Sequence, residues 1–168
     1  MHNVPDLMKE CILKIKGLEI CPNIIGQIAM DLLVCPPNKD NCSESTLRKY
    51  KEEVERNFNH LKEKAELIYT KLNTIKYFHC NEIEGAMYAF PRINFPDSFI
   101  KEANKHNVPA DYYYCTKLLE HTGLITVAGS GFGQKEGTYH IRLTNLISPK
   151  EKLVETLHKI EDFNNKIF

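Results

Sequence analysis

The chain has 168 residues, of which 42% are hydrophobic and 26% are charged, a composition typical of a globular protein that buries a core. Its 22 basic and 22 acidic residues cancel, so it lacks the excess of positive charge with which nucleic-acid binders neutralise phosphates. No apolar run approaches the roughly 20 residues that span a bilayer. We therefore expect neither a nucleic-acid partner nor a membrane partner.

The six cysteines are scattered, with no Cys-x-x-Cys pair and no short-spaced cluster with histidines. This pattern favours reduced thiols over a disulfide framework, and it predicts no metal site. Residues 1–16 mix acids, bases and Pro5 with apolar side chains, which is not typical of a secretory signal. We expect a cytoplasmic protein.

Two helices are predicted in the N-terminal part. Residues 3–16 carry apolar side chains at three- and four-residue spacing, which indicates an amphipathic helix. Residues 24–34 are apolar almost all the way round, and a short helix of this kind is normally covered on most sides. Pro36 and Pro37 end it, because proline has no amide donor and restricts its predecessor. We place a boundary here, between a helical segment 1–37 and a domain 38–168.

The next elements begin with a long helix over residues 46–72. Its apolar side chains form one stripe and the opposite face is charged, so we expect the stripe to lie on a core. Strands are predicted over 77–80 and 86–93. Two further helices follow, with Asp97 and Asp111 as candidate N-caps.

The C-terminal third alternates between strands and loops before a final helix. Strands over 124–128 and 139–146 flank a glycine-rich loop, Gly129–Gly137. The last helix is expected to begin with Ser148 as N-cap and Pro149 in the first turn. This order predicts an α+β fold, a small and mainly antiparallel sheet with helices packed on it.

The glycine-rich loop is the first candidate functional feature. Its four glycines would each cost a helix or strand about 1 kcal/mol, so the segment uses their backbone freedom. A dinucleotide-binding fingerprint is excluded because the spacing is Gly-x-Gly-x-Gly and a strand follows it. A phosphate-binding P-loop is excluded because no Gly-Lys-Ser/Thr follows. A plain surface loop remains the alternative.

Arg142 is the second candidate. In the predicted strand, Ile141 and Leu143 point to one face, and His140, Arg142 and Thr144 point to the other. An arginine placed among apolar strand residues is costly to bury unless its planar group meets an anion. That anion is either an acidic side chain of the domain, which is a structural role, or a carboxylate of a ligand.

Other polar and aromatic residues carry less information. Tyr112, Tyr113 and Tyr114 could suggest an aromatic site, but we interpret them as packing at the edge and inside of a core. His79, His106 and His121 lie near predicted turns without an evident partner. We expect surface histidines, with no nucleophile–base arrangement.

Three blocks of sequence resemble the alanine aminotransferase family. They are CPNIIGQ at residues 21–27, EGAMYAFP at 84–91 and GSGFGQKEGTYHIR at 129–142, and they occur in that family's order with similar intervals. The resemblance covers about residues 18–163. It implies the C-terminal part of a fold-type I aminotransferase, with residues 1–37 belonging to the large domain or an interface and residues 38–168 forming the small domain.

The resemblance also implies an activity. Such enzymes use pyridoxal 5'-phosphate to transfer the amino group between L-alanine and 2-oxoglutarate, giving pyruvate and L-glutamate, and the full-length enzyme is a homodimer. In that family the arginine matching Arg142 binds the α-carboxylate of the substrate. Arg142 is thus the expected substrate-binding residue, and the partners are a small amino acid and a 2-oxo acid.

The chain departs from the family at the cofactor. The lysine that holds the cofactor lies in a Ser-x-x-Lys-Gly type of segment, and no lysine here has that context: Lys150 is in a helix cap and Lys16 lacks the serine. We therefore expect no catalytic or cofactor-binding residue in this chain, and no activity from it alone. Two alternatives remain, a glutamate–glyoxylate aminotransferase and a non-catalytic interaction module derived from an aminotransferase.

Overall fold

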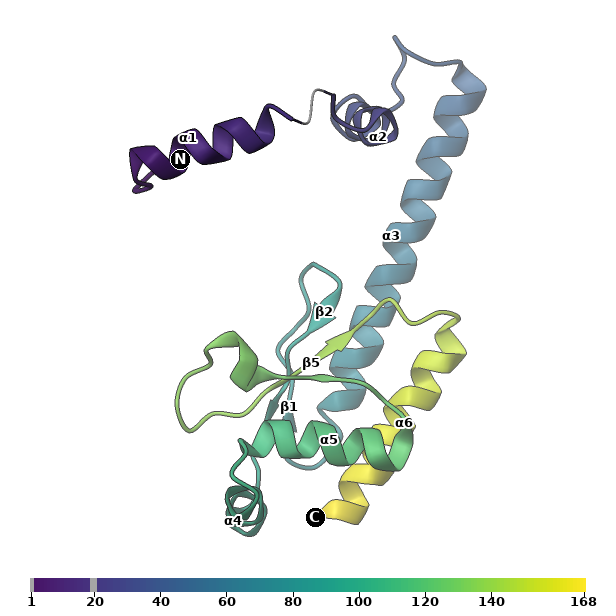
Figure 1. Cartoon of the computed structure of the whole chain (residues 1–168). Helices are drawn as coiled ribbons and strands as arrows, with labels where there is room; N and C mark the ends of the chain where they lie inside the picture. Colours follow the sequence, from purple (N-terminus) through teal and green to yellow (C-terminus); the bar gives the residue numbers. More distant parts are fainter. Residues whose placement is uncertain (1, 19–20) are drawn as a thin grey trace. The chain divides into compact units, whose positions relative to one another are not determined.

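The computed structural model describes residues 2–18 and 21–168, and it divides the chain into two compact units, Met1–Val54 and Glu55–Phe168. The ribbon is shown in Figure 1. The long helix α3 (Glu44–Leu72) begins in the first unit and ends in the second. Whether residues 1–37 belong to a large domain of a longer protein stays a prediction.

The first unit contains α1 (Asp6–Lys16) and α2 (Ile24–Val34). The Asn23 side chain caps α2 by accepting a 3.2 Å hydrogen bond from the Gly26 amide. Neither helix has a buried residue: Ile24 is 71% exposed and Leu33 is 75% exposed. The apolar surface that the sequence predicts for α2 is therefore present and uncovered in this chain.

Only part of the apolar stripe expected along helix α3 is buried. Ala65, Ile68 and Leu72 at its C-terminal end are buried, whereas Val54 and Phe58 are exposed. The stripe meets a core only where α3 enters the second unit. The expectation of a core along the whole helix was wrong for its N-terminal half.

The second unit is the predicted α+β layer. Its strands are short, and all their pairings are antiparallel: β1 with β3, and β2 and β4 on either side of β5. The bounds of the strands are β1 Phe78–His79, β2 Tyr88–Ala89, β3 Arg92–Ile93, β4 Val127–Ala128 and β5 Ile141–Thr144. The antiparallel pairing confirms the predicted fold class. The predicted strand 86–93 is divided into β2 and β3, so the strand lengths were overestimated.

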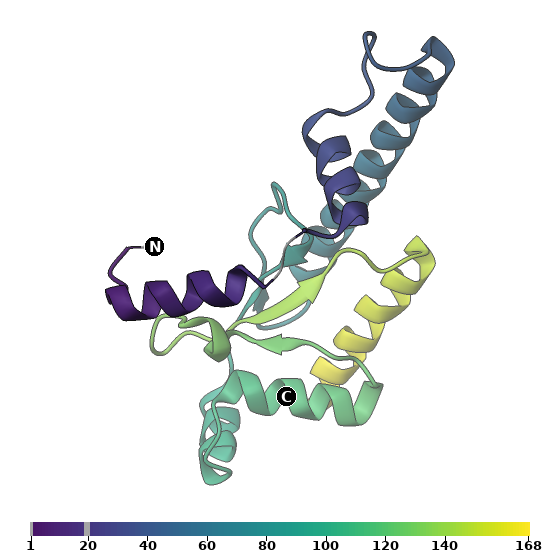
Figure 2. The ribbon, with the colours of Figure 1, turned by 45° about the horizontal axis from the view of Figure 1, so that its top comes forward.

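Three helices accompany the sheet, α4 (Asp97–Lys105), α5 (Ala110–Thr122) and α6 (Lys150–Ile167). The turned view in Figure 2 shows α5 and α6 with the strands of this unit. All three helices are preceded at the N-cap position by a proline whose side chain makes no capping bond. The predicted caps Asp97, Asp111 and Ser148 were therefore wrong by one to two positions.

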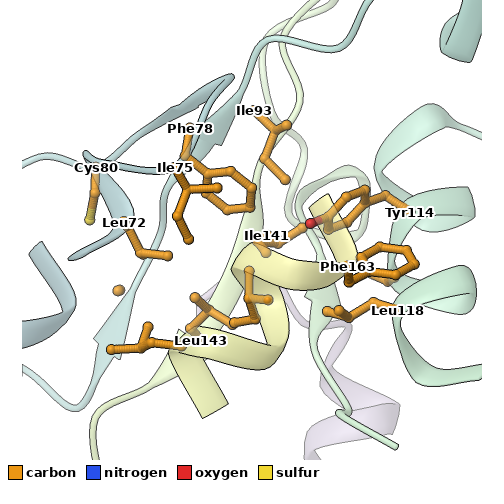
Figure 3. Close-up of a cluster of buried hydrophobic side chains, with 14 of the residues drawn as sticks. Leu72, Ile75, Phe78, Cys80, Ile93, Tyr114, Leu118, Ile141, Leu143 and Phe163 are labelled. Carbon is orange, nitrogen blue, oxygen red and sulfur yellow. The ribbon is translucent and has the colours of Figure 1, made fainter. Parts of the chain in front are cut away.

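The core of the second unit lies between β5, α5, α6 and the end of α3. Side chains of the inward face of β5, Ile141 and Leu143, pack there with Tyr114 and Leu118 of α5 (Figure 3). The contributions of the last helix are Leu153, Leu157, Ile160 and Phe163. Burying each large apolar side chain contributes about 1.5–3 kcal/mol, so this cluster dominates the stability of the unit. Within the described residues, no helix is both long and apolar enough to cross a membrane.

Candidate functional site

Strand β5 presents its residues as the alternation predicts. Ile141 and Leu143 are buried, while Arg142 and Thr144 on the opposite face are partly exposed. Arg142 pairs with Val127 of β4, and Thr144 pairs with Tyr88 of β2. The arginine therefore sits on the open face of the central strand of three, where its backbone position is set by ladders on both sides.

Two aromatic rings flank the guanidinium group of Arg142. Its Cζ atom lies 4.5 Å from the centroid of the Tyr88 ring and 5.0 Å from that of the Phe132 ring. Tyr88 comes from β2 and Phe132 ends η1 (Gly129–Phe132), a short 3-10 turn of the glycine-rich loop. Because both rings attract the cation through their faces, they hold the planar group without neutralising its charge.

Arg142 has no acidic partner among the residues that the structure describes: their recorded ion pairs involve other side chains. A structural salt bridge within the domain, which the sequence left open, is therefore not formed by these residues. A partly exposed guanidinium with rings at its faces keeps its edge donors for an anion in two parallel hydrogen bonds. The geometry suits a carboxylate.

The glycine-rich loop folds back on β5 instead of lying loose on the surface. The Gly129 amide donates a 2.7 Å hydrogen bond to the His140 carbonyl oxygen. A Cβ atom on Gly129 would lie 2.8 Å from the His140 Cβ and would also collide with the Gln134 side chain. Gly133 and Gly137 have positive φ angles of 66° and 74°, a conformation that favours glycine. The loop therefore has a defined conformation and is attached to the strand that carries Arg142.

His140 connects the loop to the aromatic residues. Its Nδ1 atom lies 2.9 Å from Gln134 Oε1, and its ring stacks on Phe90 at 4.9 Å. Phe90 in turn meets Phe132 edge to face at 5.8 Å. Burial, and secondarily the positive charge of Arg92, lower the pKa of His140, whereas Asp111 opposes this shift. Burial therefore favours the neutral imidazole.

Asp111 is a site residue that sequence reasoning missed. It is fully buried in the first turn of α5, and its Oδ2 atom accepts hydrogen bonds from the Ser130 amide at 2.6 Å and from Gln134 Nε2 at 2.8 Å. In the sequence it looked like a helix cap, because an acid after a proline is common at a helix start. Its distant partners could not be read from local spacing.

The remaining expectations concern tyrosines, histidines and cysteines. Tyr114 is buried among core rings while Tyr112 is exposed, so packing at the edge and inside of the core is confirmed. His79, His106 and His121 are exposed, as predicted. The six cysteines are free thiols, and burial raises the pKa of Cys115 to about 11, which keeps it protonated. The described residues contain no group of three or more potential metal ligands.

Known relatives match almost the entire chain. An alanine aminotransferase 2-like protein of Danio rerio is 42% identical over 95% of this chain, and a probable mitochondrial alanine aminotransferase of Dictyostelium discoideum is 41% identical over 98%. Glutamate–glyoxylate aminotransferase 2 of Arabidopsis thaliana is 38% identical over 99%. This chain covers 28%, 30% and 34% of these relatives, so it spans about a third of their length. No family model matches the chain.

Solved aminotransferase structures share the fold. The alanine aminotransferase of Pyrococcus furiosus superposes with a TM-score of 0.65 at 27% identity, over 98% of this chain and 36% of that one. An aspartate aminotransferase of Rhizobium meliloti shares the fold with a TM-score of 0.57 at 23% identity, over 86% of this chain and 32% of that one.

Proposed function

Because this chain matches part of the alanine aminotransferases in both sequence and fold, we propose that it forms the C-terminal part of an enzyme that transfers an amino group between L-alanine and 2-oxoglutarate. The products are pyruvate and L-glutamate. The observation that carries the proposal is Arg142, held between Tyr88 and Phe132 without an acidic partner among the described residues. A charge that is positioned but not paired within the domain is what a carboxylate substrate requires.

Arg142 binds the substrate carboxylate in this proposal. L-alanine and 2-oxoglutarate both have a carboxylate next to the reacting carbon, so one clamp serves both half-reactions. The fork of the guanidinium fixes the plane of that carboxylate through two parallel hydrogen bonds. The rings of Tyr88 and Phe132 restrict the rotation of the guanidinium, which limits the positions that the reacting carbon can take.

Pyridoxal phosphate, when bound, supplies the electron sink for the transfer. No lysine of this sequence lies in the Ser-x-x-Lys-Gly context that holds this cofactor in the family. We therefore assign the cofactor to the part of the enzyme outside this chain. On its own, the chain is proposed to be inactive.

The assembly and location of the enzyme are further parts of the proposal. The uncovered apolar side chains of α2 are consistent with contact to the large domain and to a second subunit in a homodimer. The free cysteines support a reducing compartment, and we propose the cytoplasm. The Dictyostelium relative bears a mitochondrial name, so fractionation of cells that express the complete enzyme is the test of location.

Transfer from glutamate to glyoxylate is the second candidate, because the Arabidopsis relative carries that name at 38% identity. Both donor pairs present the same carboxylate to Arg142, so this site does not discriminate between them. The deciding experiment measures kcat/KM of the complete enzyme for alanine with 2-oxoglutarate and for glutamate with glyoxylate. A higher kcat/KM for glutamate with glyoxylate would replace the assignment to alanine and 2-oxoglutarate. If neither pair supported transfer, the remaining alternative would be a non-catalytic interaction module derived from an aminotransferase.

A further inference from the structure

A polar connection runs from buried Asp111 of α5 through Gln134 of the glycine-rich loop to His140. The Asp111 carboxylate is fully buried, and its Oδ1 atom accepts from the Tyr112 amide at 3.0 Å. Its Oδ2 atom accepts from the Ser130 amide and from Gln134 Nε2, at 2.6 and 2.8 Å. A buried carboxylate is stable only when several donors meet it, so this group ties α5 to the start and the middle of the loop.

The donors and acceptors along this connection have one consistent orientation. Because Gln134 gives its Nε2 hydrogen to Asp111, its Oε1 atom is left as an acceptor. His140 Nδ1, 2.9 Å from that oxygen, must then carry the hydrogen. Asp111 thereby sets the amide orientation of Gln134 and the tautomer of His140.

The connection continues through rings to the guanidinium group. His140 stacks on Phe90 with an interplanar angle of 5°, and Phe90 contacts Phe132 at 5.8 Å. Phe132 is the last residue of the turn that Asp111 holds through Ser130, and its ring centroid is 5.0 Å from Arg142 Cζ. Two contacts therefore hold Phe132 in place: the hydrogen bond between Asp111 and the nearby Ser130 amide, and the contact between the rings of Phe132 and Phe90.

We propose that Asp111 is a positioning residue for the Arg142 carboxylate clamp, acting through Ser130, Gln134 and His140 on the ring of Phe132. This inference rests on the proposed function for its consequence in catalysis. Its structural part, the control of Phe132 and Arg142 by Asp111, concerns this chain alone.

A general effect of an acid at a helix start does not explain these contacts. Asp97 occupies the first turn of α4, also after a proline, and is exposed. Both acids favour the helix dipole in the same way. Only Asp111 is buried and bonded to residues 19 and 23 positions away. Asp97→Asn is therefore a matched control, with the same change of charge in the same kind of turn.

The experiment uses nuclear magnetic resonance on the labelled 168-residue chain. In the wild type, the Arg142 side-chain signals are expected at high field, because the ring currents of Tyr88 and Phe132 act on the protons between them. Asp111→Asn removes one acceptor, since its amide nitrogen must face either the Tyr112 amide or the Ser130 and Gln134 donors. We expect the Arg142 signals to lose most of their high-field shift, and Asp97→Asn to leave them unchanged.

Gln134→Met is the second variant, because it keeps the approximate size of the side chain but cannot bridge Asp111 and His140. If Asp111→Asn does not fold, this variant alone carries the test, with the same loss of shift expected. Unchanged Arg142 signals in a folded variant of either kind would overturn the inference.

The complete enzyme separates this inference from the proposed function. Asp111→Asn is expected to raise KM for alanine and for 2-oxoglutarate roughly tenfold, because the clamp is displaced but its charge remains. If the complete enzyme transfers no amino group, the proposed function fails whatever the spectra show. If Arg142 substitutions leave transfer unaffected, the clamp assignment fails. If they abolish transfer while Asp111→Asn changes neither KM nor the spectra, the positioning role fails alone.

Discussion

Gly129 and His140 approach each other so closely that only a residue without a side chain fits at position 129. The Gly129 amide bonds to the His140 carbonyl at 2.7 Å, and an added Cβ would lie 2.8 Å from the Cβ of His140. This approach attaches the start of the glycine-rich loop to the strand that carries Arg142.

Gly129→Ala is expected to destabilise the second unit by about 1–3 kcal/mol, the usual cost of overpacking, because the new methyl group displaces His140 or Gln134. Gly131→Ala is the control, since nothing lies near its added Cβ. Urea denaturation of both variants measures the free energies of unfolding. Equal losses for the two would show that loop flexibility, and not close packing, selects glycine at position 129.

Arg142→Lys keeps the charge but loses the paired donors. In the complete enzyme we expect kcat/KM for alanine to fall by about one to two orders of magnitude, since charged hydrogen bonds contribute ~1.5–3 kcal/mol. Arg142→Ala should cost more, and both half-reactions should be affected. Arg56→Ala, an exposed arginine of α3, is the control. If Arg142→Ala kept kcat/KM within about twofold of wild type, the clamp assignment would have to be abandoned.

Stability is expected to depend on the neutral state of His140. Because its pKa is lowered in the folded chain, the unfolded chain binds more protons at pH values between the two pKa values, and stability falls as the pH drops below about 6.5, the ordinary value. Urea midpoints at pH 5 and pH 8 measure the effect. His140→Gln should reduce the difference between them. An unchanged difference in His140→Gln would assign the pH dependence to other groups.

Helix α2 should exchange its amide hydrogens faster than α6 in a monomer of this chain. All its side chains are exposed, while α6 buries Leu153, Leu157 and Ile160. At higher concentration the apolar surface of α2 should drive self-association, which Leu33→Lys should weaken. Hydrogen exchange with mass spectrometry and sedimentation velocity provide both readings. Equal protection of the two helices in a proven monomer would contradict the prediction.

The purified chain should form no stoichiometric complex with pyridoxal phosphate, because none of its lysines lies in the Ser-x-x-Lys-Gly context that holds the cofactor in the family. Mixing the two should give no saturable absorbance band, and borohydride reduction should label several exposed lysines weakly. A single lysine labelled one to one would show a cofactor site in this chain.

Local sequence was sufficient for the elements whose signals are local. The bounds of α2 agree with the prediction because Asn23 and the prolines after Val34 act on neighbouring backbone groups. The alternation of Ile141 to Thr144 across β5 follows from the strand period of two. The α+β class follows from the order of these elements, and the relation to aminotransferases from three short blocks of sequence.

Tertiary structure alone decided the surroundings of Arg142. Whether the arginine would meet an acid depended on which side chains the fold brings near β5, and it brought Tyr88 and Phe132. It also turned Asp111, which the sequence indicated as a cap, into the buried acceptor of Ser130 and Gln134. The physical reason is the same in both cases: the contacts join residues far apart in the chain, so their distances depend on the packing of helices on the sheet and not on any local pattern.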